Sequence, residues 1–177
     1  MKNSLFLVAT MLSALPISAA EKKQAARLLF SATVGKTAIS VHIAERPFDP
    51  ARHNITAPRN VGTDAEPKWE PATVDGREVV GTDEPAEGKP QLSQLTVQFG
   101  KQRIDVPQKL LAHVFNPQLD PAKFNHTGVI NTVSVSADGR AVMIHLGVGD
   151  GEYARTIFFY VGADGTCTDE PLAGYEA

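Results

Sequence analysis

The sequence predicts a mostly β protein: a single-domain antiparallel β-sandwich or partly closed barrel of about seven to nine strands with one short helix. Three hairpin regions indicate this class, because turn residues in each are flanked by alternating apolar and polar positions. They lie at residues 28–45, around Gly100-Lys101, and across 129–168. Helical periodicity is confined to one short segment, so the sheets must supply the core.

The first hairpin turns at Gly35-Lys36, with glycine in the position that requires positive φ. A two-residue turn there places apolar residues opposite one another: Phe30 with Val41, Leu28 with Ile43, and Ala32 with Ile39. Gly100-Lys101 repeats the same device. It predicts the pairs Val97 with Ile104 and Leu95 with Val106.

The meander 129–168 begins with a turn at Asp138-Gly139, which we predict to be of the tight mirror-image type. That turn aligns apolar residues on one face: Val135 with Val142, Val133 with Ile144, and Val129 with Val148. A three-residue loop closed by Gly139 would mix the faces, so the tighter turn is favoured.

The next connection, 149–152, reads as a four-residue loop. It predicts that Val148 pairs with Tyr153, Ile144 with Ile157 and Val142 with Phe159. Strand 153–161 is apolar on both faces, and we therefore expect both to be covered. After a turn at Asp164-Gly165, a last short strand around 166–168 should end at the acids and proline of 169–171.

Residues 46–91 interrupt this pattern with seven of the twelve prolines and Trp69, the only tryptophan. We expect an irregular excursion containing one short hairpin around Asp75-Gly76 and packed against the sheets through Trp69. Tryptophan has two roles in such a segment: it pins the loop to the fold, or it anchors an interface. After the hairpin at Gly100-Lys101, Pro107 predicts a short helix over about 107–115.

Residues 1–20 have the features of a secretory signal peptide: Lys2, an apolar run over 5–12, and small residues at Ser18 and Ala20. Cleavage after Ala20 would leave a single β-rich domain, 21–177, in the periplasm or medium. The leader is too short to span a bilayer, and no later segment is predicted to do so. Cys167 is the only cysteine, so no intramolecular disulfide can form.

Loss of Lys2 would leave 16 of the 17 basic side chains against 20 acidic ones. This balance gives no general attraction for nucleic acid. The sequence contains no nucleophile elbow, zinc-protease helix, phosphate loop or paired Cys-x-x-Cys. We therefore assign no catalytic residue, no metal ligand and no cofactor from sequence.

Four residues remain as candidates for function in addition to Trp69. Asp150 and Glu152 present two acids at a hairpin tip, where they could meet a basic partner, although a solvated tip explains them as well. The tip lacks the set of oxygen ligands that calcium needs. His145 is predicted between Thr132 and Thr156, and His42 occupies the corresponding face of the first hairpin.

Two functional hypotheses follow. The leading one is an exported, non-enzymatic binding module that recognises a protein or cell-envelope ligand through Trp69 and nearby hairpin tips. Exported inhibitors and immunity proteins share this size and β-rich build. The alternative is a small periplasmic hydrolase or metal-dependent enzyme using His145 and His42, which requires their two sheet faces to meet.

Overall fold

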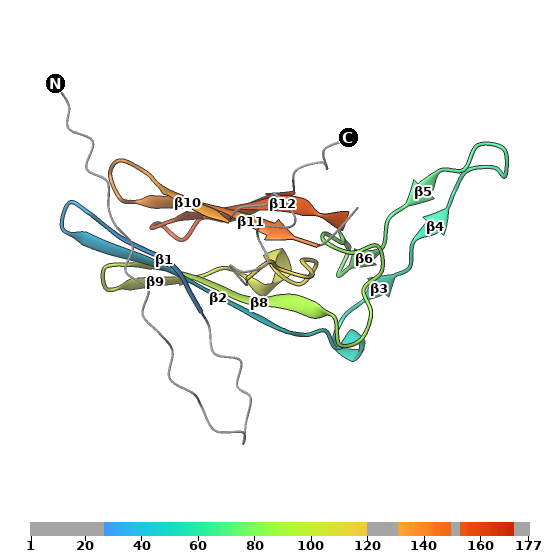
Figure 1. The fold of residues 1–177 in the computed structure, drawn as a ribbon, viewed down its shortest axis with the longest axis horizontal. Helices are drawn as coiled ribbons and strands as arrows, with labels where there is room; N and C mark the ends of the chain where they lie inside the picture. The colour runs from blue at the N-terminus through green and yellow to red at the C-terminus, as the bar shows by residue number, and fades with distance from the viewer. Residues whose placement is uncertain (1–26, 120–130, 150–152, 172–177) are drawn as a thin grey trace, which may run out of the picture.

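The computed structural model describes residues 27–119, 131–149 and 153–171, and within them two four-stranded antiparallel sheets face each other as a sandwich (Figure 1). The first sheet has the order β1 (Arg27–Val34), β2 (Thr37–Pro47), β8 (Pro90–Phe99) and β9 (Gln102–Asp105). The second has the order β10 (Thr132–Val135), β11 (Ala141–Val148), β12 (Arg155–Gly162) and β13 (Cys167–Pro171). Neither sheet closes on itself, so the sandwich form of the prediction is confirmed.

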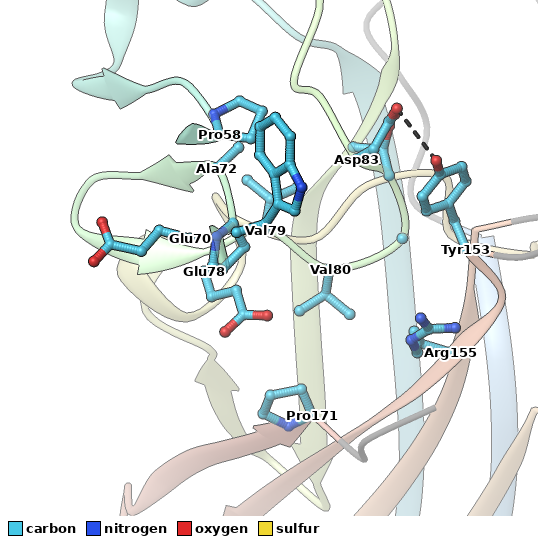
Figure 2. A pocket seen from close by; sticks show the side chains of 14 residues that line it. Pro58, Glu70, Ala72, Glu78, Val79, Val80, Asp83, Tyr153, Arg155 and Pro171 are labelled. Atoms are coloured by element: carbon cyan, nitrogen blue, oxygen red, sulfur yellow. Dashed lines mark hydrogen bonds between the residues drawn. The ribbon is translucent and has the colours of Figure 1, made fainter. Parts of the chain in front are cut away.

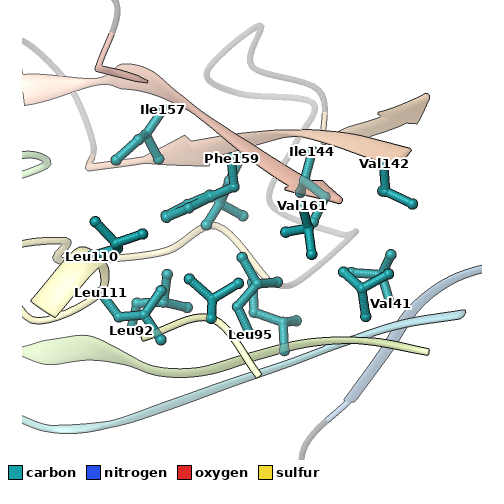
Figure 3. Close-up of a cluster of buried hydrophobic side chains, with 14 of the residues drawn as sticks. Val41, Leu92, Leu95, Leu110, Leu111, Val142, Ile144, Ile157, Phe159 and Val161 are labelled. Atoms are coloured by element: carbon teal, nitrogen blue, oxygen red, sulfur yellow. The ribbon is translucent and has the colours of Figure 1, made fainter. Parts of the chain in front are cut away.

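The core lies between the two sheets and takes alternate residues from their strands (Figure 3). Leu110 and Leu111 fill one end of it. Each fully buried aliphatic side chain contributes about 1.5–3 kcal/mol relative to exposure. The buried strand residues are Ile39, Val41 and Ile43 of β2; Leu95, Val97 and Phe99 of β8; Val142, Ile144 and Leu146 of β11; and Ile157, Phe159 and Val161 of β12.

The registers of the hairpins at Gly35-Lys36 and Gly100-Lys101 are largely confirmed. Phe30 pairs with Val41 as predicted, but a bulge between Leu28 and Phe30 shifts Leu28 onto His42 instead of Ile43. Such a bulge adds one residue to a strand, and alternation alone does not reveal it. In the hairpin at Gly100-Lys101 the predicted pairing of Val97 with Ile104 is present, and the Val106 N–H donates to the Leu95 carbonyl at 2.9 Å.

The β10–β11 register is also confirmed, with Val133 opposite Ile144. The predicted turn type is wrong, because Gly139 has a positive φ of 68° whereas Asp138 does not have a positive φ. The Gly139 N–H donates to the Ser136 carbonyl, and Ser136 Oγ accepts from the N–H groups of Arg140 and Ala141. The serine side chain thus satisfies backbone donors that a tighter turn would have paired. Val129 lies outside the described residues.

The predicted β11–β12 register is wrong by two residues. Ile144 pairs with Phe159 and Val142 with Val161. A shift of two leaves every side chain on the same face, so alternation cannot distinguish the two registers. The outer face is not covered as expected, since Met143 is 44% and Tyr160 40% exposed.

The last strand, β13, continues through Asp169, Glu170 and Pro171, which were expected to end it. It is an edge strand of the second sheet. Acids and proline belong on such an edge because they discourage pairing with another chain.

The predicted helix over 107–115 is replaced by a single 3-10 turn, Gln108–Leu110. Residues 110–115 are all buried: Leu110, Leu111 and Val114 in the core of the sandwich, and Ala112 and Phe115 against the excursion. Their backbone groups bond outward: the Val80 N–H donates to the His113 carbonyl at 3.0 Å and the Leu92 N–H to the Val114 carbonyl at 2.9 Å. These tertiary partners replace the intrahelical bonds that an amphipathic helix would need.

The excursion between β2 and β8 is more regular than predicted. Its described residues form a 3-10 turn (Pro50–Arg52), a sheet of β3 (Ile55–Thr56), β6 (Thr73–Val74) and β7 (Arg77–Glu78), and the pair β4 (Arg59–Asn60) and β5 (Trp69–Glu70). The predicted Asp75-Gly76 hairpin is present, with positive φ at both residues. A second buried cluster holds this region to the fold: Phe48, Ala72, Val74, Val79, Ala112 and Phe115.

The expected leader, 1–20, lies outside the described residues. Within the described ranges, we find no helix with the length and apolar character needed to cross a bilayer.

Candidate functional site

An ordered arm, residues 56–71, carries Trp69 away from the sandwich (Figure 1). Every residue of the arm is exposed, so hydrogen bonds rather than a core define its shape. The Asn60 Oδ1 atom accepts from the N–H groups of Gly62 and Lys68, at 2.9 and 3.0 Å. The Val61 N–H donates to the Lys68 carbonyl at 2.7 Å. The arm is thus a defined hairpin that presents its side chains to solvent.

Trp69 lies in β5 opposite Asn60, and 67% of its surface is exposed. The expectation that it packs the excursion against the sheets is therefore wrong. The excursion is anchored instead by Phe48, Val74 and Val79, which are 8% exposed or less. Those side chains lie at the base of the excursion, where β6 and the chain after β7 meet the sandwich, so they make the contacts expected of Trp69.

A pocket of about 980 Å³ lies between the arm, the segment after β7 and one end of the second sheet (Figure 2). Trp69 and its neighbours line one side. Buried Ala72, Val79 and Val80 make an apolar floor. The second sheet contributes Arg155 and Pro171, and Tyr153 lies just before β12.

Charged groups of both signs line this pocket. Among the described residues, the lining includes three carboxylates, those of Glu70, Glu78 and Asp83, and one guanidinium, that of Arg155. The carboxylate of Glu70 is paired with Arg59 Nε at 2.7 Å, and Figure 2 shows it directed away from the other labelled residues. The Glu78 carboxylate extends toward the side on which Pro171 lies.

The far rim of the pocket is polar. The hydroxyl of Tyr153 donates to Asp83 Oδ2 at 3.4 Å, which joins the second sheet to the excursion. Asp83 also lies 3.9 Å from the Nζ atom of Lys89. Arg155 donates through Nη1 to the Ala154 carbonyl at 2.8 Å, so its guanidinium is held near the sheet.

A contact between two glycines sets the distance between these walls. A Cβ atom on Gly81 would lie 2.3 Å from the Phe115 carbonyl oxygen, and one on Gly149 would lie 3.0 Å from the Gly81 Cα atom. Asn116 bridges them: its Nδ2 donates to the Gly81 carbonyl at 3.0 Å, and its own carbonyl accepts from the Gly149 N–H at 2.9 Å. Only residues without a side chain allow this approach.

A buried ionic contact links β7 to β13 beside the pocket. Arg77 Nη2 lies 2.7 Å from Asp169 Oδ2, and the Asp169 side chain is only 3% exposed. His113 Nε2 is 3.3 Å from the same oxygen, without the alignment of a hydrogen bond. Burial and the nearby Arg77 charge lower the pKa of His113 to about 4, against the opposing effect of Asp169. The imidazole is therefore neutral near pH 7.

The two candidate histidines lie on the outer faces of different sheets. His145 falls between the core residues Ile144 and Leu146, and His42 between Val41 and Ile43, so both point away from the core. Thr132 pairs with His145 as predicted. The second neighbour is Phe158 rather than Thr156, with ring centroids 4.1 Å apart. The sandwich core separates the two histidines, so the faces that the enzyme hypothesis required to meet do not.

Asp150 and Glu152 lie outside the described residues. The positions that flank them, Gly149 and Tyr153, belong to the pocket wall and its glycine contact. Among the described residues, no group of three or more His, Cys, Asp or Glu side chains is arranged to hold a metal ion.

Sequence reasoning identified Trp69 but missed Glu78, Asp83, Tyr153 and Arg155. They come from three parts of the chain, β7, the segment after it and the start of β12, and share no spacing that could have signalled a common site. The pocket exists because the excursion folds back toward the end of the second sheet.

Comparison of the chain with protein families, with curated proteins and with solved structures found no match.

Proposed function

We propose that this protein is an exported, non-enzymatic binding module that recognises a protein or other ligand of the cell envelope in the pocket beside Trp69. Export rests on the signal-peptide features of residues 1–20. The binding role rests on one observation above all: the only tryptophan of the chain is 67% exposed on an ordered arm next to a pocket.

Exposure of this indole has a physical cost that a ligand can remove. Tryptophan buries a large apolar area when it is covered, and it is among the residues most enriched at the centres of interfaces. The arm is held in shape by its own hydrogen bonds. A partner would therefore meet a preformed surface and pay little ordering entropy.

The composition of the lining also favours a ligand-binding role for the pocket. It combines an indole, three prolines, an apolar floor and several charged groups, a mixture typical of ligand pockets. No observation favours the hydrolase alternative, since His42 and His145 lie on opposite outer faces of the sandwich.

Affinity capture from envelope extract tests the proposal. The exported protein is immobilised beside two variants, Trp69→Ala and Val61→Ala. Val61 is the matched control, because it is 45% exposed on the same arm but does not line the pocket.

We expect a specific species to be retained by the wild type and by Val61→Ala and lost from Trp69→Ala, with thermal unfolding alike in all three. Retention of the same species by Trp69→Ala would refute a binding role for the pocket. A large drop in the unfolding temperature of Trp69→Ala would show a structural role instead.

A further inference from the structure

We infer that the pocket receives a lysine- or arginine-bearing segment of a partner protein, with the cation over the Trp69 indole and Glu78 as its counter-ion. This inference rests on the proposed function and specifies the chemistry of the ligand. It is carried by the state of the Glu78 carboxylate and by the apolar walls around the indole.

Among the described residues, three carboxylates and one guanidinium line the pocket. Two of those carboxylates already have cationic neighbours: Glu70 is paired with Arg59 at 2.7 Å, and Asp83 lies 3.9 Å from Lys89. Glu78 is exposed and forms no ion pair with any described residue. It is the carboxylate that is available to a charge brought by a ligand, and it extends into the space beside Pro171 (Figure 2).

Trp69 supplies the second half of the recognition. The face of an indole is the best aromatic partner for a lysine or arginine cation. Pro58 and Pro71 add apolar surface to the same side of the pocket. The aliphatic stem of a long basic side chain packs on such surface while its charged end reaches a carboxylate.

The groups of the excursion and those of the second sheet lie on different sides of the pocket. Arg155 lies in β12 on the sheet side, away from the arm, and its Nη1 atom donates to the Ala154 carbonyl. The two groups that a bound cation would contact, the Trp69 indole and the Glu78 carboxylate, both belong to the excursion, in β5 and β7. The basic residue of the ligand therefore occupies the arm side of the pocket.

Trp69 is itself the probe for this inference, because it is the only tryptophan and lies at the site. Tetra-arginine, tetra-glutamine and tetra-glutamate peptides are titrated into the full exported protein while its tryptophan emission is recorded. We expect a saturable change with tetra-arginine that weakens as salt is raised, and no saturable change with the other two.

Two substitutions separate a local contact from the overall charge of the protein. Glu78→Gln removes the proposed counter-ion, whereas Glu87→Gln removes one equal charge from an exposed position outside the pocket. We expect Glu78→Gln to weaken tetra-arginine binding about tenfold, as for loss of one charge pair beside a cation–π contact. Glu87→Gln should bind within about twofold of the wild type by the same energy scale. Both should unfold at the wild-type temperature.

Equal affinities of the two variants for tetra-arginine would overturn the inference, as would saturable binding of tetra-glutamine or tetra-glutamate. The proposed function fails in a different way, through envelope capture that does not depend on Trp69. Capture that depends on Trp69 but is unchanged by Glu78→Gln would keep the binding role and reject a cationic ligand.

Discussion

Replacing Gly81 with alanine tests the glycine contact that positions the pocket walls. Gly81 has φ of 89°, a conformation that costs a residue with a Cβ atom roughly 1–2 kcal/mol. The added Cβ would also lie 2.3 Å from the Phe115 carbonyl oxygen and 3.0 Å from the Gly149 nitrogen. Both are backbone atoms, so the clash cannot be relieved by rotating a side chain. Overpacking of this kind costs about 1–3 kcal/mol more.

Gly76 offers a matched control, because its φ is 78° and a Cβ there would meet no atom within 4 Å. Gly76→Ala should therefore lose only the unfolding free energy that the positive φ costs a residue with a Cβ atom, about 1 kcal/mol. Gly81→Ala should lose about 2–5 kcal/mol of unfolding free energy, a large fraction of the total stability of a domain of this size. The difference between the two variants isolates the close approach of the pocket walls.

Urea unfolding followed by circular dichroism measures both losses, since the exposed Trp69 is a poor reporter of the core. The free energy of unfolding is compared at equal m-values. Equal losses in Gly76→Ala and Gly81→Ala would refute the reasoning, because they would show that Gly81 is not packed against the Phe115 backbone.

Three further perturbations test the core and the buried ionic contact. Ile144→Ala should lower the free energy of unfolding by about 2–5 kcal/mol because Ile144 is fully buried. Met143→Ala should lower it by under about 1 kcal/mol because Met143 faces solvent. Similar losses for the two variants in urea titrations would contradict the assigned faces. Asp169→Ala should cost about 1–3 kcal/mol, since it leaves the Arg77 guanidinium, which is 32% exposed, without its partner. A neutral result in the same titration would mean that the contact is not formed in solution. The folded-state pKa of His113 is about 4, below its ordinary 6.5. The stability that the folded protein gains from keeping this imidazole neutral is therefore complete above pH 6.5. It is lost as the pH falls toward 4, by up to about 3 kcal/mol. His113→Gln should therefore flatten stability between pH 6.5 and 4, and an unchanged pH profile would count against this burial.

The hairpins show which strand registers the alternation of apolar and polar residues can predict. Phe30 with Val41, Val133 with Ile144 and Val97 with Ile104 all pair as predicted, because a one-residue error would have turned apolar residues toward solvent. The β11–β12 register escaped this test, since a shift of two residues preserves the faces. It depends on how the chain after Val148 packs against the excursion.

Two further misses share a cause in tertiary contacts. The segment over 107–115 has the spacing of apolar residues expected of a helix, but its backbone pairs with Val80 and Leu92, and burial on all sides removes the need for one apolar face. Trp69 was expected to anchor the excursion because tryptophan is usually covered. Phe48, Val74 and Val79 occupy the positions that face the sandwich, and the arm projects beyond them.

The sequence by itself determined the sheet-rich class of this protein, the faces of its strands and the prominence of Trp69, because these follow from local turn chemistry and a side-chain period of two. Only the tertiary structure decided that Trp69 is exposed, and that it shares a pocket with Glu78, Asp83 and residues of the second sheet. That association depends on backbone approach at Gly81 and Gly149, two positions 68 residues apart in the chain, which no local pattern of side chains encodes.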